Sequence, residues 1–386
     1  MIHRRSPAVW VFGVDEDAVQ LTWRNLGSAP LAVRVLTGGV EAGLVVDAPG
    51  SSGATLLTGL PAGRLLQIEA RHPALDRSVV LSTRTLAPLP GEALCRIATV
   101  SDLHLGTEVF GHLGTIADPF GHVAPHPVRC AAAALDEAVA WGAERILAKG
   151  DLTNGARPDE WRDFARLAHG TPVPVDALPG NHDHGPRHVE GHLLPAQAAA
   201  AFDLAVAQPL LVRDLPGVRV ILADTTVAGR HGGSLAPVRA AILDAAGEAD
   251  RAGGVLIALH HQLQPHPFPE GWPPGVGQAE SAAFLDDLGR AHPHALVTSG
   301  HTHRNRRWGR AGVVVTQVGS TKDYPGAWAG YAVHEGGIRQ IVRRIQHPDA
   351  ISWTDHSRVA AFGLWEHAAP GRLDARCFNV PWGRPT

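Results

Sequence analysis

Gly180-Asn181-His182-Asp183 and Gly300-His301-Thr302-His303 are the most informative stretches of this 386-residue chain, because each places metal-ligating side chains in a tight turn. Three further polar segments share their setting, since each directly follows an apolar run: Asp102-Leu103-His104, Gly150-Asp151 and His260-His261. Such apolar runs predict buried strands, and open α/β sheets bind their ligands at the carboxyl ends of the strands. Together the five segments predict a metal site at one edge of a sheet.

The sequence around these segments alternates between strand and helix patterns. Apolar runs that lead into the segments predict strands at residues 97–100, 145–148, 173–178, 255–259 and 295–298. Alanine-rich or amphipathic stretches predict helices at residues 127–141, 159–167, 194–207 and 236–252. Closely spaced strand patterns at residues 313–317, 331–334 and 338–345 favour an antiparallel portion. We expect an α/β domain at residues 92–345, followed by a C-terminal extension at residues 346–386 to which the sequence assigns no role.

Residues 1–88 have a different pattern, with no helical periodicity. Runs rich in Val, Leu and Thr predict short strands at residues 19–23, 31–36, 43–46, 54–57, 65–69 and 78–83. Turns rich in Gly, Pro, Asn and Ser separate them, which is typical of a small all-β sandwich and is similar to fibronectin type III modules. The proline-rich stretch at residues 87–91 predicts a linker between this domain and the next.

Composition excludes several classes of protein. The net charge of −3 disfavours a surface that neutralises many phosphates, so nucleic acid is a poor partner. The apolar stretch at residues 8–14 is too short for a signal peptide, and no run of about 18 apolar residues is present, so we expect a cytoplasmic protein with no membrane partner.

The sequence leaves open whether the protein forms a homo-oligomer. Three widely separated cysteines predict neither a disulfide framework nor a Cys-x-x-Cys metal site: Cys95, Cys130 and Cys377.

The order of the five segments (Asp-x-His, Gly-Asp, Gly-Asn-His-Asp, His, Gly-His-x-His) resembles that of the calcineurin-like metallophosphoesterase superfamily. The resemblance extends over residues 96–344, and each metal ligand of the superfamily has a counterpart. It implies two packed mixed β-sheets flanked by helices. It also implies a binuclear metal-dependent phosphoric ester hydrolase, a phosphodiesterase or phosphatase, in which a metal-bound hydroxide attacks a small phosphodiester or phosphomonoester.

The resemblance assigns a role to each ligand. Asp151 would bridge two divalent metal ions, and the remaining ligands would divide into two groups: Asp102, His104 and His303 around the first ion, and Asn181, His260 and His301 around the second. Carboxylate and imidazole ligands suit Mn, Fe, Zn or Co and do not choose among them.

Residues beside the ligands are expected to act on the substrate. In the superfamily the counterpart of His182 contacts the phosphate or protonates the leaving oxygen, and Asp183 would orient its ring and stabilise its charge. Asn181, His184 and His261 are also expected to contact substrate.

Two departures bear on the subfamily. Purple acid phosphatases also have an N-terminal β-sandwich, but they place a tyrosine where this chain has Asn154, and they lack a histidine at the position of His104. The first segment and the His260-His261 pair are more similar to class III cyclic-nucleotide phosphodiesterases and glycerophosphodiesterases, although those enzymes continue with Pro-Pro where this chain has Gln262-Leu263.

The alternatives to a phosphoesterase of small substrates are a nuclease acting on DNA or RNA ends and a catalytically inactive scaffold, which would have lost ligands that this chain retains.

Overall fold

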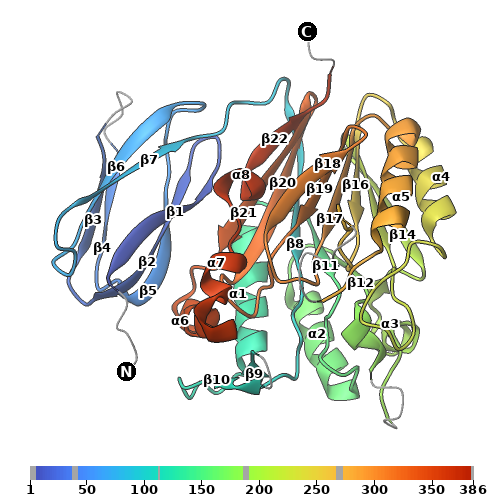
Figure 1. Ribbon diagram of the computed structural model, residues 1–386, viewed down its shortest axis with the longest axis horizontal. Helices are drawn as coiled ribbons and strands as arrows, with labels where there is room; N and C mark the ends of the chain where they lie inside the picture. Colours follow the sequence, from blue (N-terminus) through green and yellow to red (C-terminus); the bar gives the residue numbers. More distant parts are fainter. Residues whose placement is uncertain (1–5, 37–41, 112–113, 186–190, 267–272, 384–386) are drawn as a thin grey trace.

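The computed structural model describes residues 6–36, 42–111, 114–185, 191–266 and 273–383, and two large sheets that face each other form its centre (Figure 1). The seven-stranded sheet has the order β13-β12-β11-β8-β20-β21-β22, with strands at Ala205–Val206, Val175–Leu178, Arg145–Lys149, Ala93–Val100, Ala327–His334, Gly337–Arg344 and Phe378–Pro381. The six-stranded sheet has the order β14-β15-β16-β17-β19-β18, with strands at Leu210–Leu215, Val218–Ala223, Gly254–Ala258, Ala295–Ser299, Val313–Gln317 and Arg306–Arg310. Buried side chains from both sheets, among them Leu147, Leu222 and Leu296, fill the space between them.

Helices cover the outer face of each sheet. Apolar residues of α1 (His126–Ala140), α2 (Pro158–Gly170), α3 (Pro195–Phe202) and α6 (Pro348–His356) pack on the seven-stranded sheet. Those of α4 (Arg239–Gly247) and α5 (Gln278–Ala291) pack on the six-stranded sheet. The smaller elements are the β9–β10 hairpin (Val109–Phe110 and Ile116–Ala117), α7 (Trp365–Ala368) and α8 (Leu373–Arg376). The prediction of two packed mixed sheets flanked by helices is therefore confirmed.

The parallel strands explain why distant segments meet. Strands β8, β11 and β12 are parallel, as are β15, β16, β17 and β19, so their carboxyl ends share an edge. The predicted polar segments begin within two residues of the ends of β8, β11, β12, β16 and β17. Each sheet thus supplies ligand-bearing turns to the same edge of the stacked pair.

Several helices differ from the prediction. The helix expected at residues 236–252 is α4, which extends only over Arg239–Gly247. The helix expected at residues 194–207 ends at Phe202, because Asp203 adopts a left-handed conformation with a φ of 53° and the chain then enters β13. Helix α5 was not predicted, although Phe284, Leu285 and Leu288 are buried at helical spacing.

The N-terminal region consists of two small sheets that share one apolar core. One sheet has the order β1-β2-β5 (Ala8–Val14, Val19–Gly27, Gly50–Leu57), and the other the order β4-β3-β6-β7 (Gly43–Val46, Leu31–Val35, Leu65–Arg71, Val79–Arg84). The expected all-β region is thus present, and the apolar stretch at residues 8–14 is its first strand.

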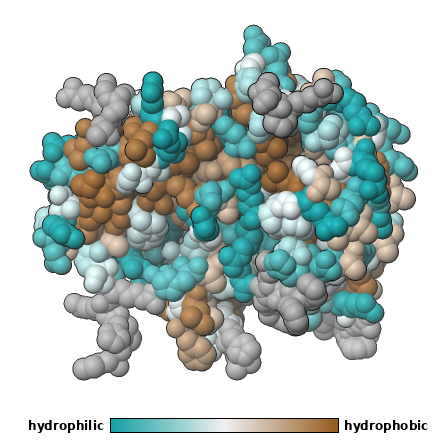
Figure 2. Space-filling view, turned by 45° about the horizontal axis from the view of Figure 1, so that its top comes forward, coloured by the Kyte–Doolittle hydropathy of each residue, from teal (hydrophilic) through white to brown (hydrophobic). Residues whose placement is uncertain are grey.

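Apolar residues gather on the left side of the space-filling view, where the N-terminal region lies (Figure 2). Exposed apolar residues of the four-stranded sheet are Val45, Leu65 and Val80. No helix among the described residues is long and apolar enough to span a membrane.

The N-terminal region packs directly on β21 and on the C-terminal residues. Arg344 of β21 is fully buried at this junction, where it donates hydrogen bonds to Thr22 Oγ1 at 2.9 Å and to Asp355 Oδ1 at 3.1 Å. Ser52 donates to the other oxygen of Asp355 at 2.7 Å, and β22 of the C-terminal residues pairs with β21. The boundaries predicted at residues 88 and 345 remain a prediction. Contacts across them include these buried polar groups and apolar ones, since Ile341 and Cys377 belong to the apolar core of the N-terminal region.

The Arg344–Asp355 pair provides a test of how far this junction stabilises the fold. Asp355→Ala should lower the free energy of unfolding by about 3 kcal/mol, because a buried guanidinium loses its carboxylate partner. Urea denaturation followed by circular dichroism measures the change. The matched control is Asp374→Ala, which removes an exposed partner of Arg372 and should change stability by less than about 0.5 kcal/mol. Equal stability of the two variants would contradict the prediction.

Candidate metal centre

The backbone of the candidate centre has an unusual conformation at five of the seven predicted ligands. Left-handed φ values occur at Asp102 (54°), His104 (46°), Asp151 (48°), His301 (69°) and His303 (54°). Non-glycine residues adopt this region rarely, and such strain concentrates at functional sites. The sharp turns after the strands therefore direct these side chains toward one another.

The Asp151 carboxylate lies between two groups of ligands. Its Oδ2 is 3.5 Å from His104 Nε2 on one side and 3.3 Å from His260 Nε2 on the other. Its Oδ1 accepts a hydrogen bond from the backbone N–H of His182 at 2.9 Å. Burial opposes ionisation of this carboxyl, but its pKa is held well below the usual value because the charges of His260 and His182 favour the anion. An anion in this position can face two cations at once.

The first group consists of Asp102, His104 and His303. The Nε2 atoms of the two histidines are 3.3 Å apart, and His303 Nε2 is 3.5 Å from Asp102 Oδ1. One potential ligand atom from each residue lies within 4.8 Å of the others, so the group could hold a metal ion. Burial lowers the pKa of His104 well below its usual value, and the neutral imidazole that results is the form that binds metals.

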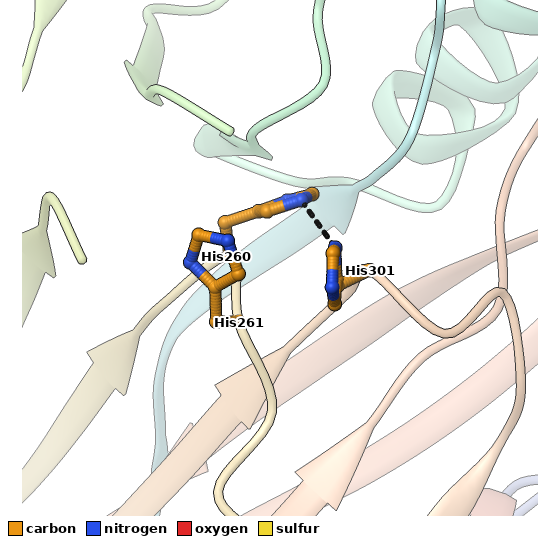
Figure 3. A group of neighbouring side chains, drawn as sticks. All are labelled: His260, His261 and His301. Carbon is orange, nitrogen blue, oxygen red and sulfur yellow. Dashed lines mark hydrogen bonds between the residues drawn. The ribbon is translucent and has the colours of Figure 1, made fainter. Parts of the chain in front are cut away.

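The second group contains His260 and His301, which Figure 3 shows beside His261. His301 Nδ1 lies 3.0 Å from His260 Nε2, and the carbonyl of Lys149 lies 2.9 Å from His260 Nδ1. That backbone contact directs His260 Nε2 toward Asp151. Burial and the neighbouring His260 lower the pKa of His301 to about 3, whereas Asp151 raises that of His260 to about 9 against the effect of burial.

The side chain of Asn181, a predicted ligand, bears on whether the candidate centre fits a metal ion. Its side-chain oxygen is buried and has no hydrogen-bond partner among the described atoms, which is costly for a polar atom unless a ligand satisfies it. Together with the converging carboxylate and imidazole groups, this oxygen fits a divalent cation. The pocket therefore has the chemistry of a divalent-metal site.

The histidine beside the second group was expected to contact substrate. His261 is fully buried, and its Nδ1 lies 2.8 Å from Thr225 Oγ1. Its ring packs edge-on against those of His260 and His301, with centroids 4.9 and 4.7 Å away. His184 Nε2 lies 2.8 Å from Thr226 Oγ1, and His184 is absent from the groups of described residues that could hold a metal. A substrate contact for either residue stays a prediction.

His182 and Asp183 occupy different environments, which corrects the expectation that Asp183 orients the His182 ring. The carbonyl of Asn154 lies 2.9 Å from His182 Nδ1 and holds that ring, whose centroid is 4.6 Å from that of His104. Asp183 is fully buried and accepts hydrogen bonds from the backbone N–H groups of Leu152, Thr153 and Gly180 at 2.8 to 3.1 Å. Its carboxylate therefore links the turn after β11, which contains Asp151, to the turn after β12, which contains Asn181. Backbone N–H groups in both turns need an acceptor, and Asp183 provides it.

The sequence did not identify two features of the centre. Asp323 is fully buried, and its Oδ2 lies 2.5 Å from His303 Nδ1. Lys149 Nζ, also fully buried, donates to Thr298 Oγ1 at 3.0 Å and to the Ser299 carbonyl at 2.9 Å, at the end of the strand that precedes Gly300 and His301. A charged residue at the end of an apolar strand, as Lys149 is, was the available signal, whereas Asp323 follows the strand predicted at residues 313–317 and belongs to none of the five polar segments.

Residues 95–305 match the family model described as calcineurin-like phosphoesterase. The chain belongs to the calcineurin-like phosphoesterase family. This confirms the resemblance read from the five segments and supports the prediction of a phosphoric ester hydrolase.

Individual relatives of this calcineurin-like phosphoesterase are distant. A protein of Rhodococcus erythropolis described as a probable cyclic nucleotide phosphodiesterase is 28% identical over 182 residues, which make up 46% of this chain and 57% of that protein. The chain thus matches little more than half the length of this relative. Similar structures include a purple acid phosphatase from yellow lupin seeds, with 14% identity, a TM-score of 0.47 and coverage of 90% of this chain and 73% of that one. PhoD has 10% identity, a TM-score of 0.44 and coverage of 88% and 87%.

Proposed function

We propose that this protein is a binuclear metal-dependent phosphoesterase that hydrolyses a small phosphodiester or phosphomonoester. The observation that carries the proposal is the position of Asp151 Oδ2, 3.5 Å from His104 Nε2 and 3.3 Å from His260 Nε2. Two cations held a few ångströms apart repel each other, and an anion between them offsets that repulsion. A carboxylate flanked by imidazoles on both sides provides that anion.

The seven ligands divide between two metal sites in this proposal. Asp102, His104 and His303 hold one ion and share Asp151 with the second, which Asn181, His260 and His301 complete. One site then has two carboxylates and the other has one carboxylate and a neutral amide, so the sites differ in charge and should differ in affinity. Two bound divalent ions would supply a nucleophilic water at neutral pH and neutralise charge on the phosphate oxygens.

His182 has the geometry of a substrate-facing group. With Nδ1 held by the Asn154 carbonyl, its Nε2 is the nitrogen left to meet a ligand, and the residue is only half-buried beside His104. A protonated Nε2 can contact a phosphate oxygen or give its proton to the departing oxygen, which is a poor leaving group as an alkoxide. Asp183 contributes indirectly, by fixing the turns that carry Asp151 and His182.

The substrate class rests on charge and on the described relative. A net charge of −3 disfavours long nucleic acids, which bind through many phosphate contacts. The Rhodococcus relative is named as a probable cyclic nucleotide phosphodiesterase, so cyclic nucleotides belong among the first substrates to test.

The metal-free protein should be inactive and should regain activity with Mn²⁺. The assay compares bis(p-nitrophenyl) phosphate, p-nitrophenyl phosphate and 3′,5′-cyclic AMP, with EDTA-treated protein as the control. We expect hydrolysis of at least one substrate only when metal is present, since water alone is too weak a nucleophile near neutral pH. Hydrolysis that persists unchanged after complete metal removal would contradict a metal-dependent mechanism.

A further inference from the structure

We propose that residues 346–386 belong functionally to the metal centre, because they hold Asp323 against His303 and thereby set the affinity of the Asp102–His104–His303 site. The contacts from Trp365 through Asp323 to His303 form a chain, the Asp323 relay. The inference rests on the proposed function, since it assumes that His303 binds a metal. Asp323 and Trp365 act through His303 and are positioning residues.

The contact between Asp323 and His303 fixes the orientation of the imidazole. Asp323 Oδ2 accepts the hydrogen on His303 Nδ1 at 2.5 Å, which leaves Nε2 as the nitrogen with a free lone pair. That Nε2 faces the other ligands, 3.5 Å from Asp102 Oδ1 and 3.3 Å from His104 Nε2. A carboxylate behind a ligating imidazole fixes its tautomer and makes it a stronger donor.

Asp323 is fully buried, so its position depends on the groups that surround it. Trp365 of α7 donates its indole N–H to Asp323 Oδ1 at 3.3 Å and to the Tyr324 carbonyl at 3.1 Å. Lys322 Nζ lies 3.7 Å from Asp323 Oδ2 and 4.7 Å from the ring centre of Phe110. The indole and the ammonium therefore stabilise the carboxylate from two sides.

The loop at residues 320–324, which contains Asp323, contacts both the C-terminal residues and the metal centre. Trp353 of α6 donates to the Lys322 carbonyl at 2.5 Å, and Ser357 Oγ accepts from the Tyr324 N–H at 2.8 Å. On the other side, Ser320 Oγ donates to the Asp102 carbonyl at 2.9 Å. A shift of α6 or α7 would thus reach two ligands of one site, Asp102 and His303. Among the described contacts, His260 and His301 of the other site do not touch Asp323 or Trp365; their link to this loop is indirect, through the His301 N–H that donates to the Asp102 carboxylate.

Selective loss of one metal-binding step is the expected result. In the metal-free protein, Asp323→Ala should weaken one of two Mn²⁺ binding steps by about 10- to 100-fold, as loss of a carboxylate behind a ligating histidine does. Asp323→Asn keeps an acceptor for Nδ1 but loses the charge, so its effect should be smaller in the same step. Trp365→Phe keeps the ring, loses the N–H donor and should weaken that step least. Isothermal titration calorimetry gives the affinities, and elemental analysis after dialysis counts the bound ions.

Two controls separate a relay from a general loss of structure. Trp382→Phe is the same change in the same C-terminal residues, but its ring stacks on His294, and both binding steps should remain as in the wild type. Asn181→Ala, which removes a ligand of the other site, isolates the remaining step, and Asp323→Ala should still weaken binding in that background. Thermal melts of the metal-free variants report folding independently of metal.

The outcomes distinguish this inference from the proposed function. A wild-type protein that binds fewer than two Mn²⁺ ions, or hydrolyses none of the phosphate esters, would remove the proposed function itself. A wild type that binds and hydrolyses, with unchanged affinities in folded Asp323→Ala, overturns the relay alone. Equal weakening of both steps also overturns it, because a structural defect would act on the whole centre. If Asp323→Ala does not fold, Asp323→Asn and Trp365→Phe decide by the same criterion.

Discussion

Asp151→Asn is expected to abolish phosphoesterase activity, with a loss of at least about 10³-fold. The substitution replaces the anion between the two ligand groups by a neutral amide of the same size. Bound cations contribute several kcal/mol of charge stabilisation in the transition state, and each 1.36 kcal/mol corresponds to about a tenfold change in rate. We also expect fewer than two Mn²⁺ ions per chain, measured by elemental analysis after dialysis.

The fold should survive this substitution, which makes the result specific. Asparagine tolerates the left-handed φ of 48° at this position, and its amide oxygen can still accept the His182 N–H that now lies 2.9 Å from Asp151 Oδ1. Asp176→Asn is the matched control. Asp176 is also buried in the seven-stranded sheet, but it pairs with Arg145 and Arg213 and not with the centre. That variant should keep its metals and its turnover, and normal turnover by Asp151→Asn with two bound metals would refute the bridging role.

The sequence predicted the position of the centre because parallel strands bring their carboxyl ends together. Asp102 and His301 are far apart in the chain, yet both follow a buried strand, and the backbone N–H of His301 donates to the Asp102 carboxylate at 3.0 Å. Apolar runs followed by metal-ligating residue types indicate such positions, since the strand direction decides at which edge they emerge; the assignment of each ligand came from the family resemblance. The left-handed turns at the ligands could not be foreseen, because Asp and His do not specify that conformation by themselves.

The supporting contacts were beyond what one sequence shows. The group that holds His182 is a backbone carbonyl, that of Asn154, and a carbonyl leaves no trace in the residue type. Asp183 was assigned to the His182 ring because it is adjacent in sequence, whereas the short helical turn directs it to the Leu152 and Thr153 amides. The C-terminal helices reach the centre through tertiary packing alone, so their relation to His303 required the structure.

His182→Ala should separate chemistry from metal binding. Because His182 is not among the seven proposed ligands, both metals should remain bound, while turnover falls by about 10²–10⁴-fold, as expected for a lost acid–base group. The fall should be larger for an alkyl phosphodiester than for bis(p-nitrophenyl) phosphate, since p-nitrophenolate departs without protonation. The measurement is kcat for both substrates at saturating Mn²⁺.

The leaving-group comparison also decides between two roles for the same nitrogen. If Nε2 only contacts a phosphate oxygen, its loss should slow both substrates by the same factor, because both present the same phosphate. If it protonates the departing oxygen, the ratio of the two rates changes, and His182→Gln should not restore it, because glutamine can donate a hydrogen bond but cannot transfer a proton at neutral pH. Loss of a bound metal in His182→Ala would contradict both roles, because His182 would then be a metal ligand. The structure allows this outcome, since ligand atoms of His104, Asp151 and His182 lie within 4.8 Å of one another.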